Sequence, residues 1–352
     1  MTAIEAKFEA QKIAFGPFYF QAAVAIKELG LLDALVRKRG PMTPGALAEA
    51  CSVSLYAAKA LCEAGFCAGL LTRDAESGTY EITKVGRYIR ADRMTEVNLN
   101  FTQEVCYAGL ARLTESFRTG RPEGLKVFGD WPTVYEGLSE LPEGVKQAWF
   151  EFDHFYSDDA FLVALDLVFA ESPRHVLDIG GNTGKWAAAC CGRDADVEVT
   201  LVDLPGQLQV AQARLDAQGF AARVHYAEVD LLDDTQSLPT GADVVWMSQF
   251  LDCFGDDEIR SILTRVHQAI DDDATVYILE PFWDNQEFEA GRFCLVGTSL
   301  YFSCIANGNS KMLGIDEMKE HGRATGFELV SAHPLLGDSY HTLLELKKRT
   351  AE

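Results

Sequence analysis

The chain has 352 residues, of which 48% are hydrophobic, and a formal net charge of −22. This length favours two domains and is ample for a hydrophobic core. The strong negative charge argues against nucleic acid and against an anionic membrane surface, because both require a basic patch. There is no signal-peptide pattern at the start and no apolar run of bilayer length. The nine cysteines contain no CxxC pair, so we expect reduced thiols in a cytoplasmic protein without a metal site.

The first 105 residues are expected to form a small helical domain with a β-hairpin. The expected elements are helices at 22–29, 44–50 and 55–64, and hairpin arms at 69–72 and 79–83. This order is typical of a winged helix. The segment Leu55–Leu61, which would enter a DNA groove, carries one lysine and no arginine. We therefore expect a structural or dimerising role and no nucleic-acid partner.

A helical, aromatic-rich connector is predicted from residue 106 to residue 165. Most of its aromatic side chains should pack in a core. A few should face a cleft, because ligand pockets favour aromatic linings.

The last part of the chain, residues 166–352, alternates apolar strand-like runs with helical segments. This pattern predicts a doubly wound α/β fold with a mainly parallel sheet. A helix at 316–325 separates the last β-pair from the rest. The seven predicted strands are 176–179, 199–202, 224–228, 244–248, 275–280, 327–334 and 341–347.

A glycine-rich turn follows the first of these strands. Asp178 stands near the strand end, and Gly180, Gly181 and Gly184 follow it in a Gly-Gly-x-x-Gly spacing. Glycines permit backbone angles and close approaches that a Cβ would block, and such a turn presents backbone N–H groups to a ligand. The spacing is neither that of a dinucleotide site nor that of a P-loop. An acidic residue just before the glycines suits a ligand with an ammonium group, such as S-adenosylmethionine (SAM).

A second acid, Asp203, ends the next strand, 25 residues after Asp178. In a βαβ unit, an acid at this position reaches the ribose hydroxyls of a nucleoside. The alternative is an ordinary loop with a capping aspartate. Two matching loops in succession favour nucleoside binding.

With these motifs in place, the chain resembles the small-molecule O-methyltransferases of the plant caffeate and bacterial polyketide type. The resemblance covers nearly the whole chain and implies a SAM-dependent Rossmann-like domain of seven strands with an N-terminal winged-helix dimerisation domain. It therefore implies a homodimer. The first SAM motif corresponds to 177–184. The other implied cofactor contacts are Asp203 and Leu204 at the ribose, Asp230 and Leu231 at the adenine, and Ser248 with Gln249 where the family often has a lysine.

The catalytic region departs from the family pattern. Asp252 stands where the family has its histidine base, and Glu280 matches a glutamate that orients the base. A second family glutamate falls near Met312 and is missing. An aspartate is a weak base unless burial or another carboxylate raises its pKa, and Asp252 with Glu280 could form such a pair. Asp252 could instead be a helix N-cap or a solvated loop acid.

Another candidate base lies on the connector. His154 stands between Phe152 and Tyr156. The resemblance implies that Phe152, Tyr156 and Met312 contact the substrate. A histidine among aromatic residues is more often simply packed and hydrogen-bonded.

The residues and the resemblance together predict a SAM-dependent methyltransferase for a small aromatic, phenolic acceptor, either free or carrier-bound. One alternative is methylation of a ring carbon, because the chain is similar over 248–254 to methyltransferases of aryl-polyene pathways. Another alternative is a family member that binds SAM without transferring the methyl group, as in a hydroxylase-like or regulatory protein.

Overall fold

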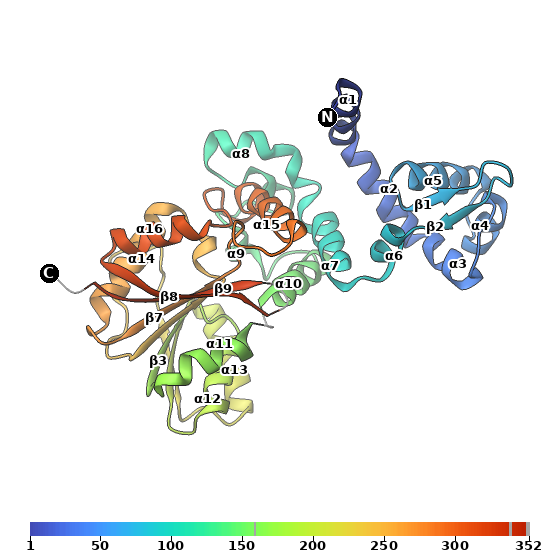
Figure 1. Cartoon of the computed structure of the whole chain (residues 1–352). Coiled ribbons are helices and arrows are strands. Elements are labelled where there is room, and N and C mark those ends of the chain that lie inside the picture. Colours follow the sequence, from blue (N-terminus) through green and yellow to red (C-terminus); the bar gives the residue numbers. More distant parts are fainter. Residues whose placement is uncertain (158–159, 338–339, 350–352) are drawn as a thin grey trace. The chain divides into compact units, whose positions relative to one another are not determined.

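A computed structural model describes residues 1–157, 160–337 and 340–349. The chain divides into two compact units, an N-terminal unit, Met1–Val105, and a C-terminal unit, Cys106–Glu352 (Figure 1). Among the described residues, no helix combines the length and the apolar character needed to cross a bilayer.

The N-terminal unit contains the three predicted helices and the predicted hairpin. Thr43 caps α4 by accepting a hydrogen bond from the N–H of Ala46 at 3.2 Å, and Gly30, at φ +77°, ends α2. Its elements are α1 (Ala3–Ala14), α2 (Gly16–Glu28), α3 (Leu31–Lys38), α4 (Pro44–Cys51), α5 (Leu55–Cys67), β1 (Leu71–Arg73), β2 (Tyr80–Ile82), α6 (Lys84–Ala91), α7 (Arg93–Phe101) and η1 (Thr102–Cys106), the last of which runs across the boundary between the units.

Helix α1 buries none of its residues in this chain. The side chains of Ile4, Phe8 and Ile13 are exposed, as is that of Phe18 at the start of α2. A row of large apolar side chains in water is unfavourable and marks a surface for association.

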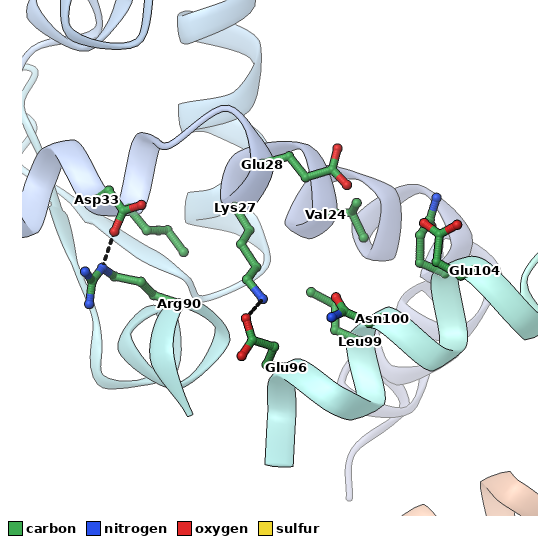
Figure 2. Close-up of a pocket in the computed structure, with 11 residues that line it drawn as sticks. Val24, Lys27, Glu28, Asp33, Arg90, Glu96, Leu99, Asn100 and Glu104 are labelled. Carbon is green, nitrogen blue, oxygen red and sulfur yellow. Dashed lines mark hydrogen bonds and ion pairs between the residues drawn. The ribbon is translucent and has the colours of Figure 1, made fainter. Parts of the chain in front are cut away.

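A cavity of about 320 Å³ lies within the N-terminal unit (Figure 2). Two ion pairs lie at this cavity, Lys27–Glu96 at 3.1 Å and Arg90–Asp33 at 2.6 Å. The side chains in both pairs are partly exposed, so each pair contributes little to stability. None of the predicted site residues lines this cavity.

The C-terminal unit contains the predicted seven-stranded sheet, in the order β5-β4-β3-β6-β7-β9-β8. The strands β3 to β7 are parallel, and β9 runs antiparallel to both β7 and β8. The strands are β3 (His175–Ile179), β4 (Glu198–Asp203), β5 (Val224–Glu228), β6 (Val244–Ser248), β7 (Thr275–Glu280), β8 (Phe327–Leu336) and β9 (His341–Lys348). All seven predicted strands are confirmed within a few residues.

The helices of this unit include the predicted one near 316–325, which is α16. The α-helices are α8 (Leu113–Thr119), α9 (Val134–Gly137), α10 (Glu143–Ser157), α11 (Phe161–Val168), α12 (Lys185–Arg193), α13 (Pro205–Ala217), α14 (Asp256–Ala269), α15 (Glu289–Tyr301) and α16 (Ile315–Ala324). The short 3-10 helices are η2 (Gly109–Arg112), η3 (Glu123–Val127), η4 (Phe169–Glu171) and η5 (Leu251–Cys253), and η6 (Phe302–Ala306) is a short π-helix.

Helices cover both faces of the sheet (Figure 1). Val176 of β3 packs with α11, α12 and α13, whereas its neighbour Leu177 packs with α14 and α16. Buried parallel strands need apolar residues on both faces, which explains their unbroken apolar runs. The chain leaves β3 for β4 on one side and returns to β6 on the other. This switch point places a crevice at the carboxyl ends of β3 and β6.

Candidate active site

The glycine turn after β3 needs glycine at three positions for different physical reasons. Gly180 has φ +73°, and a Cβ there would meet the ring of Phe250 at 2.1 Å. A Cβ on Gly181 would lie 2.7 Å from the Asp178 carboxylate. Gly184 has φ +72°, and its Cβ would meet Leu215 of α13 at 2.7 Å. The third glycine therefore serves close helix packing, and its predicted contact with the cofactor stays a prediction.

Two acids flank this turn. Asp178 is 2% exposed, and its Oδ2 has no hydrogen-bond partner among the described residues. Burial, and secondly the charge of Asp203, raises the pKa of Asp178 to about 8. Asp203 accepts hydrogen bonds from the N–H groups of Asn182 at 2.9 Å and Leu204 at 2.7 Å, while burial raises its pKa. A ligand that brings a positive charge to Asp178 would relieve this unfavourable burial.

A cavity of about 80 Å³ opens at the turn. It brings together five predicted cofactor residues, Asp178, Gly180, Gly181, Ser248 and Gln249. The other lining residues come from the turn, from neighbouring helices and from β6, and they are Asp153, His154, Phe161, Asn182, Thr183, Lys185, Trp186 and Trp246.

The predicted adenine contacts lie on a loop after β5, outside the lining of this cavity. The N–H of Asp230 donates to the Gln236 side chain at 3.0 Å, and Leu231 is buried. Arg265 of α14 holds the loop by donating to the backbone carbonyls of Leu231 and Asp233. A buried arginine that donates to several carbonyls fixes the shape of the loop. The sequence alone does not reveal this role of Arg265, because the residue lies more than thirty positions after the loop.

The two predicted catalytic carboxyl groups are both buried. Asp252 is 5% exposed in the turn η5, and Glu280 is 2% exposed at the end of β7. Helix α14 begins at Asp256 after Gly255, so the alternative that Asp252 caps this helix is wrong. The alternative of a solvated loop acid is wrong as well.

Burial governs the protonation of both acids. It raises the pKa of Asp252 to about 7, and the nearby Asp153 adds to this. Burial and the charge of Asp252 raise the pKa of Glu280 well above its usual range. Glu280 Oε1 accepts hydrogen bonds from the N–H groups of Phe250 and Leu251, both at 3.0 Å, whereas Oε2 has no partner among the described residues. Such a pair can hold a proton near neutral pH.

Polar and aromatic groups adjoin the acid pair. The thiol of Cys253 donates to Asp252 Oδ1 at 3.5 Å and is hydrogen-bonded to the hydroxyl of Tyr135. The indole N–H of Trp149 on α10 donates to the Tyr301 hydroxyl at 2.7 Å. Burial raises the pKa of both tyrosines well above their usual range, so both hydroxyls stay protonated.

The remaining predicted residues differ in their surroundings. His154 Nδ1 lies 3.0 Å from the Nζ of Lys185 and 3.9 Å from Oδ2 of Asp153. Phe152 and Tyr156 pack against each other on α10 with ring centroids 4.9 Å apart. Met312 is 8% exposed, and its N–H donates to the Ser299 hydroxyl at 3.1 Å. Their roles toward an acceptor stay predictions.

Family models match both units of the chain. The O-methyltransferase domain matches residues 111–327, and a Dimerisation2-like domain matches residues 7–77. The chain belongs to the O-methyltransferase family. It is a SAM-dependent methyltransferase, as the sequence predicted, and its N-terminal unit carries the dimerisation domain of the family.

Individual relatives of this methyltransferase are 25–27% identical to it over the aligned residues. It is 25% identical to the L-tyrosine C(3)-methyltransferase of Streptomyces lavendulae, over 83% of this chain and 79% of that protein. It is 27% identical to the 3-hydroxy-5-methyl-1-naphthoate 3-O-methyltransferase of Streptomyces sahachiroi, over 78% and 77% of the two chains. The solved mitomycin 7-O-methyltransferase MmcR has the same fold, with a TM-score of 0.71, 19% identity and 98% of each chain covered.

The site of this methyltransferase fits SAM. The Oδ2 atom of Asp178, which has no hydrogen-bond partner among the described residues, suits the ammonium of the cofactor, and Gly181 keeps the turn close to that carboxylate. Asn182, in the left-handed region at φ +48°, gives its N–H to Asp203 and so fixes the acid predicted to hold the ribose.

Two tryptophans of the cavity were missed by the sequence reading. Trp186 of α12 and Trp246 of β6 stack at 3.7 Å with an interplanar angle of 8°. Both line the cavity, and neither indole N–H has a partner among the described residues. Trp186 stands two residues after the last glycine of the motif, but only the fold brings Trp246 beside it.

Proposed function

We propose that this methyltransferase transfers the methyl group of SAM to a phenolic oxygen of a small aromatic acceptor, with Asp252 and Glu280 as the proton-accepting pair. The buried position of Asp252 carries the proposal. Asp252 comes four residues after Ser248, the last residue of β6, which lines the cofactor cavity. Its raised pKa of about 7 makes it a far better base than an ordinary aspartate. We also propose that the segment 106–165 forms the wall of the acceptor cleft.

Aromatic side chains on and near α10 support an aromatic acceptor. Trp149, Phe152, Tyr156 and Tyr301 provide flat apolar surfaces with a few hydroxyl and indole groups, which is the composition that binds small aromatic rings. The names of two similar proteins, which act on tyrosine and on a naphthoate, agree with this class. A panel that contains both free and carrier-bound acceptors distinguishes these two forms of the substrate.

The chain has two tasks in such a reaction. SAM supplies a methyl group that is already activated by its positive sulfur. The protein holds the acceptor oxygen in line with that methyl group and receives the phenolic proton. Asp252 takes the proton, while the backbone N–H groups that bind Glu280 Oε1 keep the second carboxyl in place.

Methylation of a ring carbon is a second candidate. The absence of the family histidine and the similarity to a tyrosine C(3)-methyltransferase favour it. Asp252 would again remove the phenolic proton, because a phenolate directs electron density to the ring carbon beside it. After methyl transfer, the dienone that forms would release its ring proton to water, which restores the aromatic phenolate.

We further propose that the protein is a homodimer in the cytoplasm. The dimerisation-domain match and the exposed apolar face of α1 support association of two copies. No disulfide links the nine cysteines, all of which lie among the described residues, and this agrees with a reducing compartment.

Release of S-adenosylhomocysteine (SAH) tests the activity directly. The purified enzyme is incubated with SAM and a panel of hydroxybenzoates and hydroxycinnamates, free and carrier-bound, and products are identified by NMR. An O-methyl product supports the first candidate, and a ring-methyl product supports the second. The proposal fails if tight SAM binding is accompanied by no SAH release with any phenol, as expected for a family member that binds SAM without transfer.

A further inference from the structure

Gln249 stands in an unusual position beside the cofactor cavity. It follows β6 with φ +45°, in the left-handed region, and its N–H donates to the carbonyl of Leu279 at 2.9 Å. Its side-chain nitrogen lies 3.1 Å from the carbonyl oxygen of Tyr156 and 2.8 Å from Nε2 of His341. One amide thus joins the end of β6, the end of α10 and the start of β9.

The chemistry of these contacts fixes the orientation of the amide. An amide nitrogen only donates, and the Tyr156 carbonyl only accepts, so the second N–H must point to a lone pair on His341 Nε2. His341 is fully buried, and burial lowers its pKa to about 3, so the ring is neutral and can accept. Because both amide hydrogens are committed to the protein, the side-chain group that Gln249 can offer to a ligand in the cavity is its amide oxygen.

We propose that His341 is a positioning residue that locks the Gln249 amide, so that the cofactor cavity receives a hydrogen-bond acceptor for the ammonium group of SAM beside the Asp178 carboxylate. An ammonium carries three donors and no acceptor, so it requires an environment of acceptors. Asp178 and Gln249 line the same cavity and provide such groups. Without His341 only the Tyr156 carbonyl would hold the amide, so its oxygen would be less firmly placed toward the ammonium.

The lock also holds α10. The Tyr156 carbonyl belongs to the last turn of α10 and accepts a hydrogen bond from the Gln249 side chain. This bond fastens the helix that carries His154 to the strand end beside it. Loss of the lock should therefore disturb the cofactor cavity locally, without loss of the sheet.

Two ligands that differ at the ammonium separate positioning from general damage. SAH keeps the amino-acid part of SAM, whereas 5′-methylthioadenosine keeps the nucleoside and the thioether but lacks the ammonium. We expect His341→Leu to weaken SAH binding about tenfold in calorimetry, the scale of one hydrogen bond to a charged group, and to change 5′-methylthioadenosine binding by less than about twofold. His341→Gln, which returns an acceptor at similar reach, should restore most of the SAH affinity.

Gln249→Met keeps the proposal testable if His341→Leu does not fold, because Gln249 lies in the cavity wall and is not fully buried. It should show the same selective loss, and the double variant should lose no more than either single variant. An equal loss for both ligands would show a merely structural role and overturn the proposal, as would unchanged SAH binding. These measurements need no methyl acceptor, so they stand or fall separately from the reaction proposed above.

Discussion

Replacement of Asp252 by asparagine separates catalysis from stability at one residue. The change keeps the shape of the side chain and removes its ability to take a proton. If Asp252 is the base, turnover should fall by about 10²- to 10⁴-fold, the usual contribution of a general base, with little change in SAM affinity. SAH release under saturating SAM measures the first effect, and calorimetry measures the second.

The same change should stabilise the protein at high pH. The pKa of Asp252 is raised from 3.8 to about 7 in the folded protein. Between these values the folded protein holds a proton that the unfolded chain has released, so the free energy of unfolding decreases as pH rises through this window. At 1.36 kcal/mol per pH unit, the full loss above pH 7 is on the order of 4 kcal/mol.

Asparagine has no proton to lose, so Asp252→Asn should gain stability relative to the wild type as pH rises from 4 to 8. Urea unfolding at several pH values measures this difference. Asp257→Asn, an equivalent change at an exposed position five residues away, is the control and should leave turnover and stability nearly unchanged. Wild-type turnover in Asp252→Asn would refute the catalytic role and direct attention to His154. A pH-independent stability difference would refute the raised pKa.

Four further outcomes are expected. Asp203→Ala should weaken SAM binding by about 1.5–3 kcal/mol in calorimetry, since it removes a charged hydrogen-bond acceptor, and unchanged affinity would exclude Asp203 from the site. Gly181→Ala should reduce SAM binding while circular dichroism stays native, because its methyl group would press on Asp178; normal affinity would contradict the tight turn. Phe8→Asp should shift the protein toward monomer in sedimentation, and an unaltered dimer would show that α1 lies outside the interface. Duplex DNA should show no salt-sensitive binding in fluorescence anisotropy, given the sparse basic residues of Leu55–Leu61, and a steep salt slope would overturn this.

The structure shows which group a side chain at Gly180 would contact. The sequence suggests that a side chain at Gly180 would intrude on the cofactor. In the structure that side chain would instead meet Phe250, and the positive φ would strain any substituted residue. Gly180→Val should therefore disturb the turn itself, as well as the cavity beside it.

The sequence by itself determined the seven strands, the glycine turn and the acids at the ends of β3 and β4. These features are local: a buried parallel strand needs a continuous apolar run, and a turn of this shape needs glycine within a few residues of the strand end. Asp178 and Gly181 could be recognised from such a short segment. Asp252 and Glu280 were found only because a family resemblance supplied the positions.

Only the tertiary structure decided which distant side chains meet and which carboxyl groups are buried. Gln249 and His341 are 92 residues apart in the chain, yet their side chains lie 2.8 Å apart because antiparallel pairing of β9 with β7 brings its first residue to the end of β6. Trp186 of α12 stacks on Trp246 because the parallel pairing of β6 with β3 brings β6 beside the helix that follows β3. The pattern of residues along a strand encodes its period and its burial, whereas partners across the sheet depend on strand order and register, which no local segment contains.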